Sequence, residues 1–137
     1  MKKSKANFIL ILVFFIGLSL LLYPTVSDFW NSFHQTRAIA SYAEAVESLD
    51  QDEYDKMWKE AQEYNKELTE VGNLWVLTKS EKERYRQLLD VSGTGIIGYI
   101  DIPSINCSLP VYHGVDEAVL QIAIGHLEGT SLPVGGI

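Results

Sequence analysis

The apolar run at residues 8–22 constrains this chain more than any other feature. It carries no charged side chain, and with its uncharged neighbours it extends to about twenty residues, enough for a helix to cross a hydrocarbon layer of about 30 Å. Lys2, Lys3 and Lys5 precede the run and acidic residues follow it, so the positive-inside rule places the N-terminus in the cytoplasm. We therefore predict a cytoplasmic N-terminus and a retained single-pass anchor in the plasma membrane over residues 1–27, with the rest of the chain outside.

A cleaved signal peptide is the competing interpretation of the same run. Cleavage needs small residues close to the end of the apolar stretch. The one small-x-small sequence, Ala38-Ile39-Ala40, lies far beyond residue 22, out of reach of a peptidase that acts at the membrane surface. A retained anchor is therefore favoured.

Charge and cysteine content limit the partners and the covalent cross-links that this chain can have. The chain has 18 acidic and 11 basic residues, a net charge of -7, and neither lysine nor arginine occurs after residue 90. Such a surface repels phosphate backbones, which argues against a nucleic-acid partner. The single cysteine, Cys107, excludes an internal disulfide. Beyond the anchor there is room for at most one small domain.

Residues 28–68 are expected to form extracytoplasmic helices. Apolar side chains recur there at steps of three and four, and glycine and proline are absent. Asp50, followed by Glu53 three residues later, resembles a capping box, so we predict two helices rather than one. Each would pack its apolar stripe on a neighbouring domain, since the break leaves too few heptads for a coiled coil.

A second helix start and a strand pair follow. Ser80 with Glu83 predicts a short helix over residues 80–89. The β-rich runs 96–102 and 107–112, joined by four residues, predict a hairpin that has no third strand to pair with. Asp116 is expected to cap a helix that reaches about Ile124. The predicted fold class is thus a membrane anchor helix plus α+β.

Three short sequences carry a resemblance to a known family: GYIDIP at 98–103, LPVYHG at 109–114 and GHLEGTSLP at 125–133. They resemble the N-terminal part of the catalytic domain of sortases, and their sequences are most similar to those of the pilus-assembling class C sortases. The resemblance implies that residues 95–137 begin a sortase-type β-barrel, which is incomplete here. It also implies a cysteine transpeptidase that joins LPxTG-type pilin or surface proteins to pilin lysines or to the cell wall.

Class C sortases carry a lid with an Asp-Pro-aromatic motif over the active-site cysteine. By this resemblance, residues 69–94 would contain both the lid-like segment and the short helix. Asn73 and Trp75 occupy the corresponding place, so the aromatic residue matches and the aspartate and proline do not. Trp75 would still fill an apolar groove, but an uncharged Asn73 forms no ion pair with an arginine. The alternative is that this segment is a short apolar strand or part of the core.

The family's catalytic histidine, cysteine and arginine are expected after residue 137, so we assign no catalytic residue in this chain and expect it to be inactive alone. A thiolate nucleophile and its base could in principle come from Cys107 with His113 or His126. The resemblance places His126 in a structural motif, and we expect Cys107 to be a small buried thiol. The spacing of the three matches no known metal site, so no metal and no cofactor is predicted.

The sequence is also compatible with a second class of function. The chain would then be a non-enzymatic single-pass membrane adaptor that binds an envelope partner through its outer helices. An adaptor built on helices alone has no use for the predicted hairpin or for the turn that follows residue 125, which favours the sortase interpretation.

Overall fold

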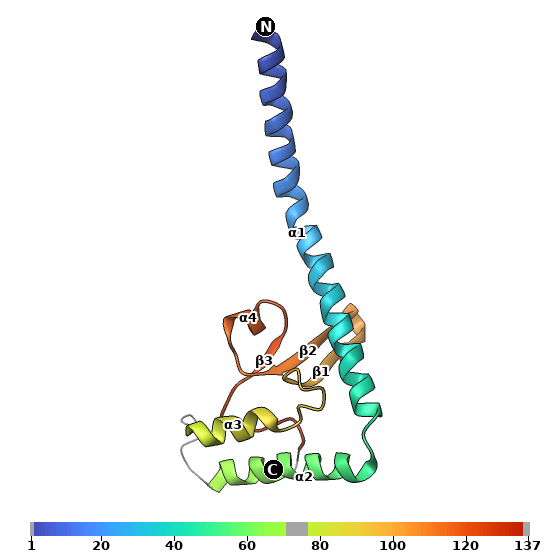
Figure 1. Ribbon diagram of the computed structural model, residues 1–137, viewed down its shortest axis with the longest axis vertical. Helices are drawn as coiled ribbons and strands as arrows, with labels where there is room; N and C mark the ends of the chain where they lie inside the picture. The colour runs from blue at the N-terminus through green and yellow to red at the C-terminus, as the bar shows by residue number, and fades with distance from the viewer. Residues whose placement is uncertain (1, 71–76, 136–137) are drawn as a thin grey trace. The chain divides into compact units, whose positions relative to one another are not determined.

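The structure is a computed structural model that describes residues 2–70 and 77–135 (Figure 1). Its elements, in chain order, are helices α1 (Lys2–Glu47), α2 (Gln51–Glu70) and α3 (Lys79–Gln87), strand β1 (Ile96–Ile102), the 3-10 turn η1 (Pro103–Ile105), strand β2 (Cys107–His113), helix α4 (Glu117–Leu120) and strand β3 (Ile124–His126). The chain divides into two compact units, Met1–His34 and Gln35–Ile137, which are described separately.

The first unit consists of the N-terminal part of α1. Its apolar side chains are exposed, and α1 is long and apolar enough over Asn7–Glu47 to cross a membrane, a test that a signal sequence also passes. Pro24 lies inside the helix. The sequence predicted an anchor followed by a separate outer helix, whereas α1 continues without a break to Glu47. From residue 25 to 47 the chain has no further glycine or proline to end it.

The predicted break between two helices near Asp50 is confirmed. Helix α1 ends at Glu47 and α2 begins at Gln51, where the Asp50 carboxylate accepts a hydrogen bond of 2.8 Å from the backbone N–H of Glu53. That bond satisfies one of the free N–H groups at the start of α2. One face of α2 is buried, and it carries Ala61, Tyr64, Asn65 and Leu68.

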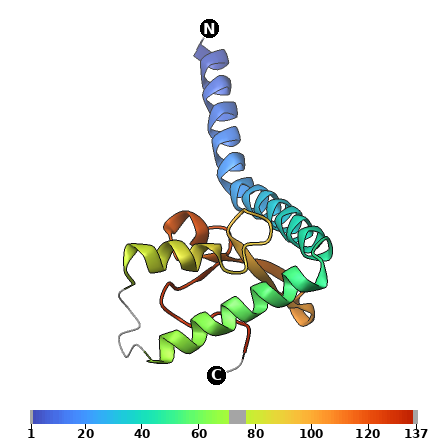
Figure 2. The same cartoon turned by 60° about the horizontal axis from the view of Figure 1, so that its bottom comes forward.

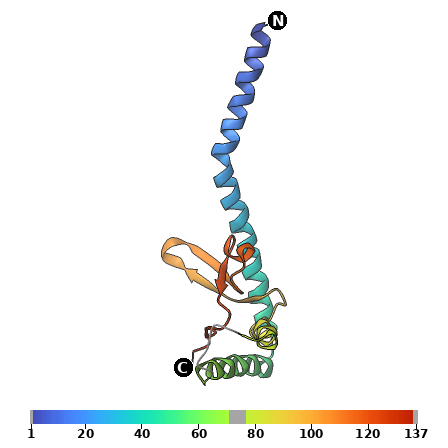
Figure 3. The same cartoon turned by 90° about the vertical axis from the view of Figure 1, so that its left-hand side faces the viewer.

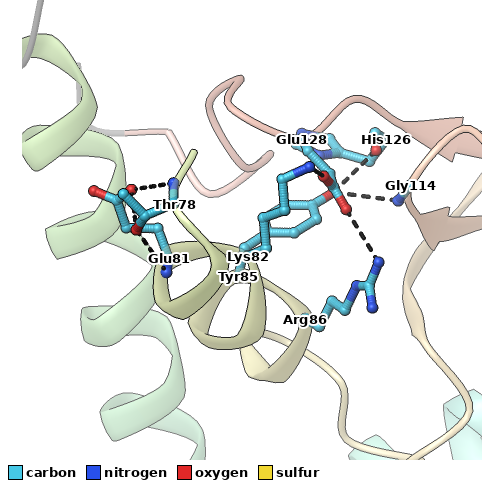
Figure 4. Close-up of polar contacts among 8 residues, drawn as sticks. All are labelled: Thr78, Glu81, Lys82, Tyr85, Arg86, Gly114, His126 and Glu128. Atoms are coloured by element: carbon cyan, nitrogen blue, oxygen red, sulfur yellow. Dashed lines mark hydrogen bonds and ion pairs between the residues drawn. The ribbon is translucent and has the colours of Figure 1, made fainter. Parts of the chain in front are cut away.

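The start of α3 differs from the prediction. Thr78, not Ser80, is the N-cap: its backbone is extended, its hydroxyl accepts from the N–H of Glu81, and the Glu81 carboxylate accepts from the N–H of Thr78. Figure 4 shows this reciprocal pair. Ser80 and Glu83 have the same spacing two residues further on, but a helix has one first turn, and the earlier pair closes it.

The hairpin is confirmed, with β1 and β2 antiparallel and Ile102 opposite Cys107. Its four-residue connection contains η1 and ends at Asn106, whose φ of 51° lies in the left-handed region that asparagine tolerates. The tip of the hairpin extends away from the helices in Figure 3, and Ile105 there is exposed.

The segment after the hairpin corrects two predictions. Helix α4 follows Asp116 as expected but ends at Leu120, and Ile124 belongs to β3, which pairs in parallel with β2. The hairpin therefore does have a third strand. Gly125 makes this pairing possible, because a Cβ there would lie 2.4 Å from the carbonyl oxygen of Gly114. The backbone N–H of Gly114 donates to the carbonyl of His126 across the same contact, at 2.9 Å.

The core of the second unit lies where α2, α3 and the start of the sheet meet the segment after β3. Its buried residues are Ala61, Tyr64, Leu68, Tyr85, Leu88, Leu89, Ile97, Leu132 and Val134. Figures 2 and 3 show α3 lying beside α2, and an ion pair between Arg84 and Glu67 links the two helices. The C-terminal part of α1 reaches the sheet through the Tyr42 hydroxyl, which donates to the carbonyl of Ile97 at 3.1 Å.

Asn65 of α2 makes a buried polar contact with the segment after β3. Its amide donates to the carbonyl of Leu132 at 2.9 Å and accepts from the N–H of Leu132 at 2.7 Å. We predict that Asn65→Ala lowers the free energy of unfolding by about 1–3 kcal/mol, because the N–H of Leu132 then stays buried without a partner, while its carbonyl keeps only the bond from the N–H of Val134. Thermal or urea unfolding of the detergent-solubilised chain measures this. Gln87→Ala, at an exposed position of α3, is the control, and equal losses for the two variants would contradict the prediction.

Candidate functional site

A polar cluster that links several elements centres on Tyr85 of α3, whose side chain is fully buried. Its hydroxyl lies 2.8 Å from Nδ1 and 2.9 Å from the carbonyl oxygen of His126, and 3.4 Å from the N–H of Gly114 (Figure 4). The other ring nitrogen of His126, Nε2, lies 3.0 Å from the carbonyl oxygen of Ser131. The Tyr85 hydroxyl donates its proton to the carbonyl oxygen of His126, whereas the donor in its contact with Nδ1 depends on which ring nitrogen of His126 carries a proton.

Burial determines the protonation of this cluster. Desolvation raises the pKa of Tyr85, so its hydroxyl keeps its proton and stays a donor at neutral pH. Removing that donor would leave the end of β3 and the loop after β2 without their shared contact to α3. The cluster thus joins α3 to two strands through one hydroxyl group.

His113, at the end of β2, packs edge-on against Tyr85, with ring centroids 4.7 Å apart. Both of its ring nitrogens are buried without a hydrogen-bond partner among the described residues. Burial lowers the pKa of His113. The carboxylate of Asp90 and the nearby backbone groups of Leu88 and Gly95 favour the charged form of His113, but more weakly than burial disfavours it. Neither backbone group forms a hydrogen bond with the ring, and the nearby His126 also disfavours the charged form. His113 is therefore neutral in the fold.

Glu128, just after β3, holds α3 from the outside. It forms ion pairs with Lys82 at 3.0 Å and Arg86 at 3.4 Å (Figure 4). The hydrogen bond from Lys82 is the main reason that the pKa of Glu128 lies below its usual range. These contacts place one carboxylate between two cations on successive turns of the same helix.

Cys107 lies away from both candidate histidines. It is the first residue of β2 and His113 is the last, so about 20 Å of extended chain separates them at 3.3 Å per residue. His126 pairs in register with His113 and shares that far end. The thiol therefore has neither histidine as a base. The prediction that Cys107 is buried is wrong: the side chain is half-exposed, because the hairpin extends beyond the rest of the sheet there.

An open groove of about 370 Å³ lies between the helices and the sheet of the second unit. Its lining is largely apolar and comes from α1, α2, β1 and the segments at residues 89–91 and 133–134. Residues of α1 and α2 form one side, among them Tyr42, Val46 and Trp58, and Ile97 and Tyr99 of β1 form another. Trp58 stacks on Tyr54 at a centroid distance of 5.8 Å.

The lid-like residues and the possibility of a metal site remain to be compared with the structure. Asn73 and Trp75 lie outside the described residues, so their lid-like role stays a prediction. Within residues 2–70 and 77–135 no three histidine, cysteine or acidic side chains come together in a way that would hold a metal ion. The sequence predicted a helix over residues 80–89 but gave no sign that the hydroxyl of Tyr85 joins it to two strands.

Comparison with known proteins identifies the fold. No family model and no curated protein sequence matches the chain. Among solved structures it is similar to sortase C1 from Streptococcus agalactiae, with 48% identity and a TM-score of 0.69 over 73% of this chain and 52% of that one. Sortase C from Streptococcus pneumoniae has 35% identity and a TM-score of 0.58, over 73% of this chain and 50% of that one. Sortase C from Clostridium perfringens, in an intermolecular complex with a C-terminal cell wall sorting signal motif, has 32% and 0.54, over 74% and 47%.

The solved structures that the chain resembles over about 73% of its length are class C sortases, which confirms the family that the sequence motifs indicated. The chain spans about half the length of the sortase structures that it matches. The three-stranded sheet and the helices are consistent with part of a sortase fold.

The neutral state of His113 leads to a pH prediction. Burial places its folded pKa below the usual 6.5, so in the window between the two values the unfolded chain binds a proton that the folded chain does not. Stability is then highest above the unfolded pKa and falls as the pH decreases through that window. We expect the melting temperature of the solubilised chain to drop between about pH 7.5 and pH 5, and His113→Phe, which keeps a ring against Tyr85, to reduce that drop. His34→Gln is the control, and an unchanged pH slope in His113→Phe would contradict the prediction.

Proposed function

We propose that this chain supplies the membrane-anchored front part of a class C sortase. The observation that carries the proposal is its 48% identity to Streptococcus agalactiae sortase C1 over 73% of its length. The whole enzyme would be a cysteine transpeptidase that cleaves an LPxTG-type sorting signal through a thioacyl intermediate. It would then pass the acyl group to a pilin lysine or to the cell wall. The sorting signal bound to the Clostridium perfringens relative supports this substrate class.

The proposed part of this chain in that reaction is structural. A thiolate nucleophile needs a base within hydrogen-bond reach, and Cys107 has neither His113 nor His126 near it. Both histidines instead pack against Tyr85. We therefore propose that residues 95–137 begin the barrel that carries the catalytic groups elsewhere in the enzyme, and that the 137 residues alone do not turn over substrate.

The proposed organisation follows the same reasoning along the chain. Residues 1–27 would be the cytoplasmic end and the membrane anchor, residues 28–68 the outer helices, and residues 69–94 the lid-like segment with the short helix. The exposed apolar surface of α1 over residues 8–22 supports the anchor. The similarity to class C sortases over about 73% of the chain favours this proposal over the adaptor alternative.

A chimera tests the proposed function directly. Residues 35–135 of this chain would replace the matching part of Streptococcus agalactiae sortase C1, and cysteine-dependent cleavage of an LPxTG-type peptide would be measured. We expect the chimera to cleave the peptide, because the transplanted residues build the same sheet and helices. Exchange of the nucleophilic cysteine in the Streptococcus agalactiae half is the control that should abolish cleavage. A chimera that melts cooperatively and yet cleaves nothing would refute the proposal.

Cys107 gives a second test in the same chimera. Cys107→Ala should leave the cleavage rate unchanged, because the thiol lies at the hairpin tip without a base. The isolated chain should likewise show no thiol-dependent cleavage, with or without Cys107. Activity of the isolated chain that disappears on Cys107→Ala would overturn this interpretation of the cysteine.

Membrane topology is tested with a reporter fused after Ile137. We expect reporter activity only outside the cytoplasm, because Lys2, Lys3 and Lys5 hold the N-terminus inside. Replacing all three lysines with glutamate should weaken or scramble the orientation. Activity of the unaltered fusion in the cytoplasm contradicts the assignment.

A further inference from the structure

Just beyond the apolar run, α1 carries a second apolar feature that the anchor alone does not require. Five large side chains, Tyr23, Val26, Phe29, Trp30 and Phe33, are each between 57% and 74% exposed. At 100° per helical residue they fall within a sector of about 120°. We call this sector the aromatic face. Its rings are in contact with His34, which lies edge-on to Trp30 at 4.9 Å and to Phe33 at 6.0 Å.

The other side of the same turns is polar. Asp28, the first acidic residue of the chain, and Asn31 lie on the side of the helix away from the aromatic face by the same angular count. Residues 8–22, in contrast, are apolar on every side. The helix therefore changes at about residue 23 from an all-round apolar rod to an amphipathic one. That change is typical of a helix leaving hydrocarbon for the lipid interface.

Distance along the helix decides whether these rings can reach lipid. If the span ends near Val26, Trp30 lies about 6 Å and Phe33 about 10 Å further along the axis at 1.5 Å per residue. The headgroup layer on each side of a bilayer is about 5–8 Å thick. An upright helix would thus keep Trp30 within that layer and lift Phe33 out of it, unless the helix leans.

Pro24 supplies the lean. Inside a helix its ring presses on the carbonyl of residue 20 and removes one backbone hydrogen bond, which opens the helix on the proline side. By the angular count Pro24 lies about 180° from Phe33 and more than about 90° from the other four residues. The bend therefore tips the following turns toward the aromatic face, which lowers its rings toward the membrane.

We propose that residues 23–34 form an interfacial segment whose aromatic face rests in the headgroup layer of the bilayer and fixes the depth of the anchor. The occupant is lipid, because the face is continuous with the apolar span of the same helix and four of its five side chains are aromatic, a class that favours this layer. The inference rests on the proposed membrane anchor, and it adds a second lipid contact with Pro24 as its positioning residue.

The test follows Trp30 in the full chain reconstituted in phosphatidylcholine vesicles. The chain has three tryptophans, so Trp58→Phe and Trp75→Phe leave Trp30 as the only one. We expect blue-shifted emission, stronger quenching by lipids brominated near the headgroup than by lipids brominated deep in the acyl chain, and weak quenching by aqueous iodide. The difference between the unaltered chain and Trp30→Phe gives the same signal if the double variant is unstable.

Three variants separate the contributions. Phe29→Ser with Phe33→Ser should shift Trp30 emission to the red and increase quenching by iodide, with no loss of vesicle flotation. Pro24→Ala should shift both in the same direction by a smaller amount, because an upright helix keeps Trp30 within the headgroup layer but lifts Phe33 out of it. Asn31→Ser, on the polar side, is the matched control and should change neither.

The outcomes distinguish this inference from the proposed function. A chain that does not float with vesicles overturns the anchor itself. A chain that floats while Trp30 is fully open to iodide and insensitive to brominated lipid overturns the interfacial segment and leaves the anchor standing. Shielding of Trp30 that disappears when the protein is diluted in excess lipid shows that a second copy covers the face, which also overturns the inference.

Discussion

The buried hydroxyl of Tyr85 is the contact on which the arrangement of the second unit most depends. It meets Nδ1 and the carbonyl of His126 and the N–H of Gly114, so one atom joins α3 to the end of β3 and to the loop after β2. A buried hydroxyl is costly unless it is hydrogen-bonded, and here the partners are fixed by the parallel pairing of β2 with β3. The position of α3 and the existence of β3 therefore support each other.

The elements that were predicted correctly have local causes. The Asp50 cap, the break between α1 and α2, and the hairpin with its four-residue connection each arise from residues a few positions apart. The start of α3 was missed because Thr78 with Glu81 and Ser80 with Glu83 have the same spacing, and only the completed structure shows which pair closes the first turn. Strand β3 was missed because its three residues pair with β2 across a separate turn, and such a contact leaves no periodic trace in the sequence.

The site was less predictable than the fold. The three short sequences at 98–133 identified the family correctly, but the roles of their residues depend on burial. His113 and His126 look like catalytic candidates in a sequence, whereas the structure packs both against Tyr85 at the opposite end of β2 from Cys107. Cys107 was expected to be buried because thiols usually are, and its exposure follows from its place at the hairpin tip.

The GHLEGTSLP sequence at 125–133 has a physical role that follows from these contacts. His126 binds Tyr85, Glu128 binds Lys82 and Arg86, and Leu132 binds Asn65, so the first two residues tie this segment to α3 and the third ties it to α2. The contacts differ in strength: an ion pair open to solvent contributes about 0–1 kcal/mol, whereas breaking a buried hydrogen bond costs about 1–3 kcal/mol. Tyr85 and Asn65 therefore dominate, and the two cations around Glu128 refine the orientation of α3. This sortase-like sequence thus docks α2 and α3 onto the sheet.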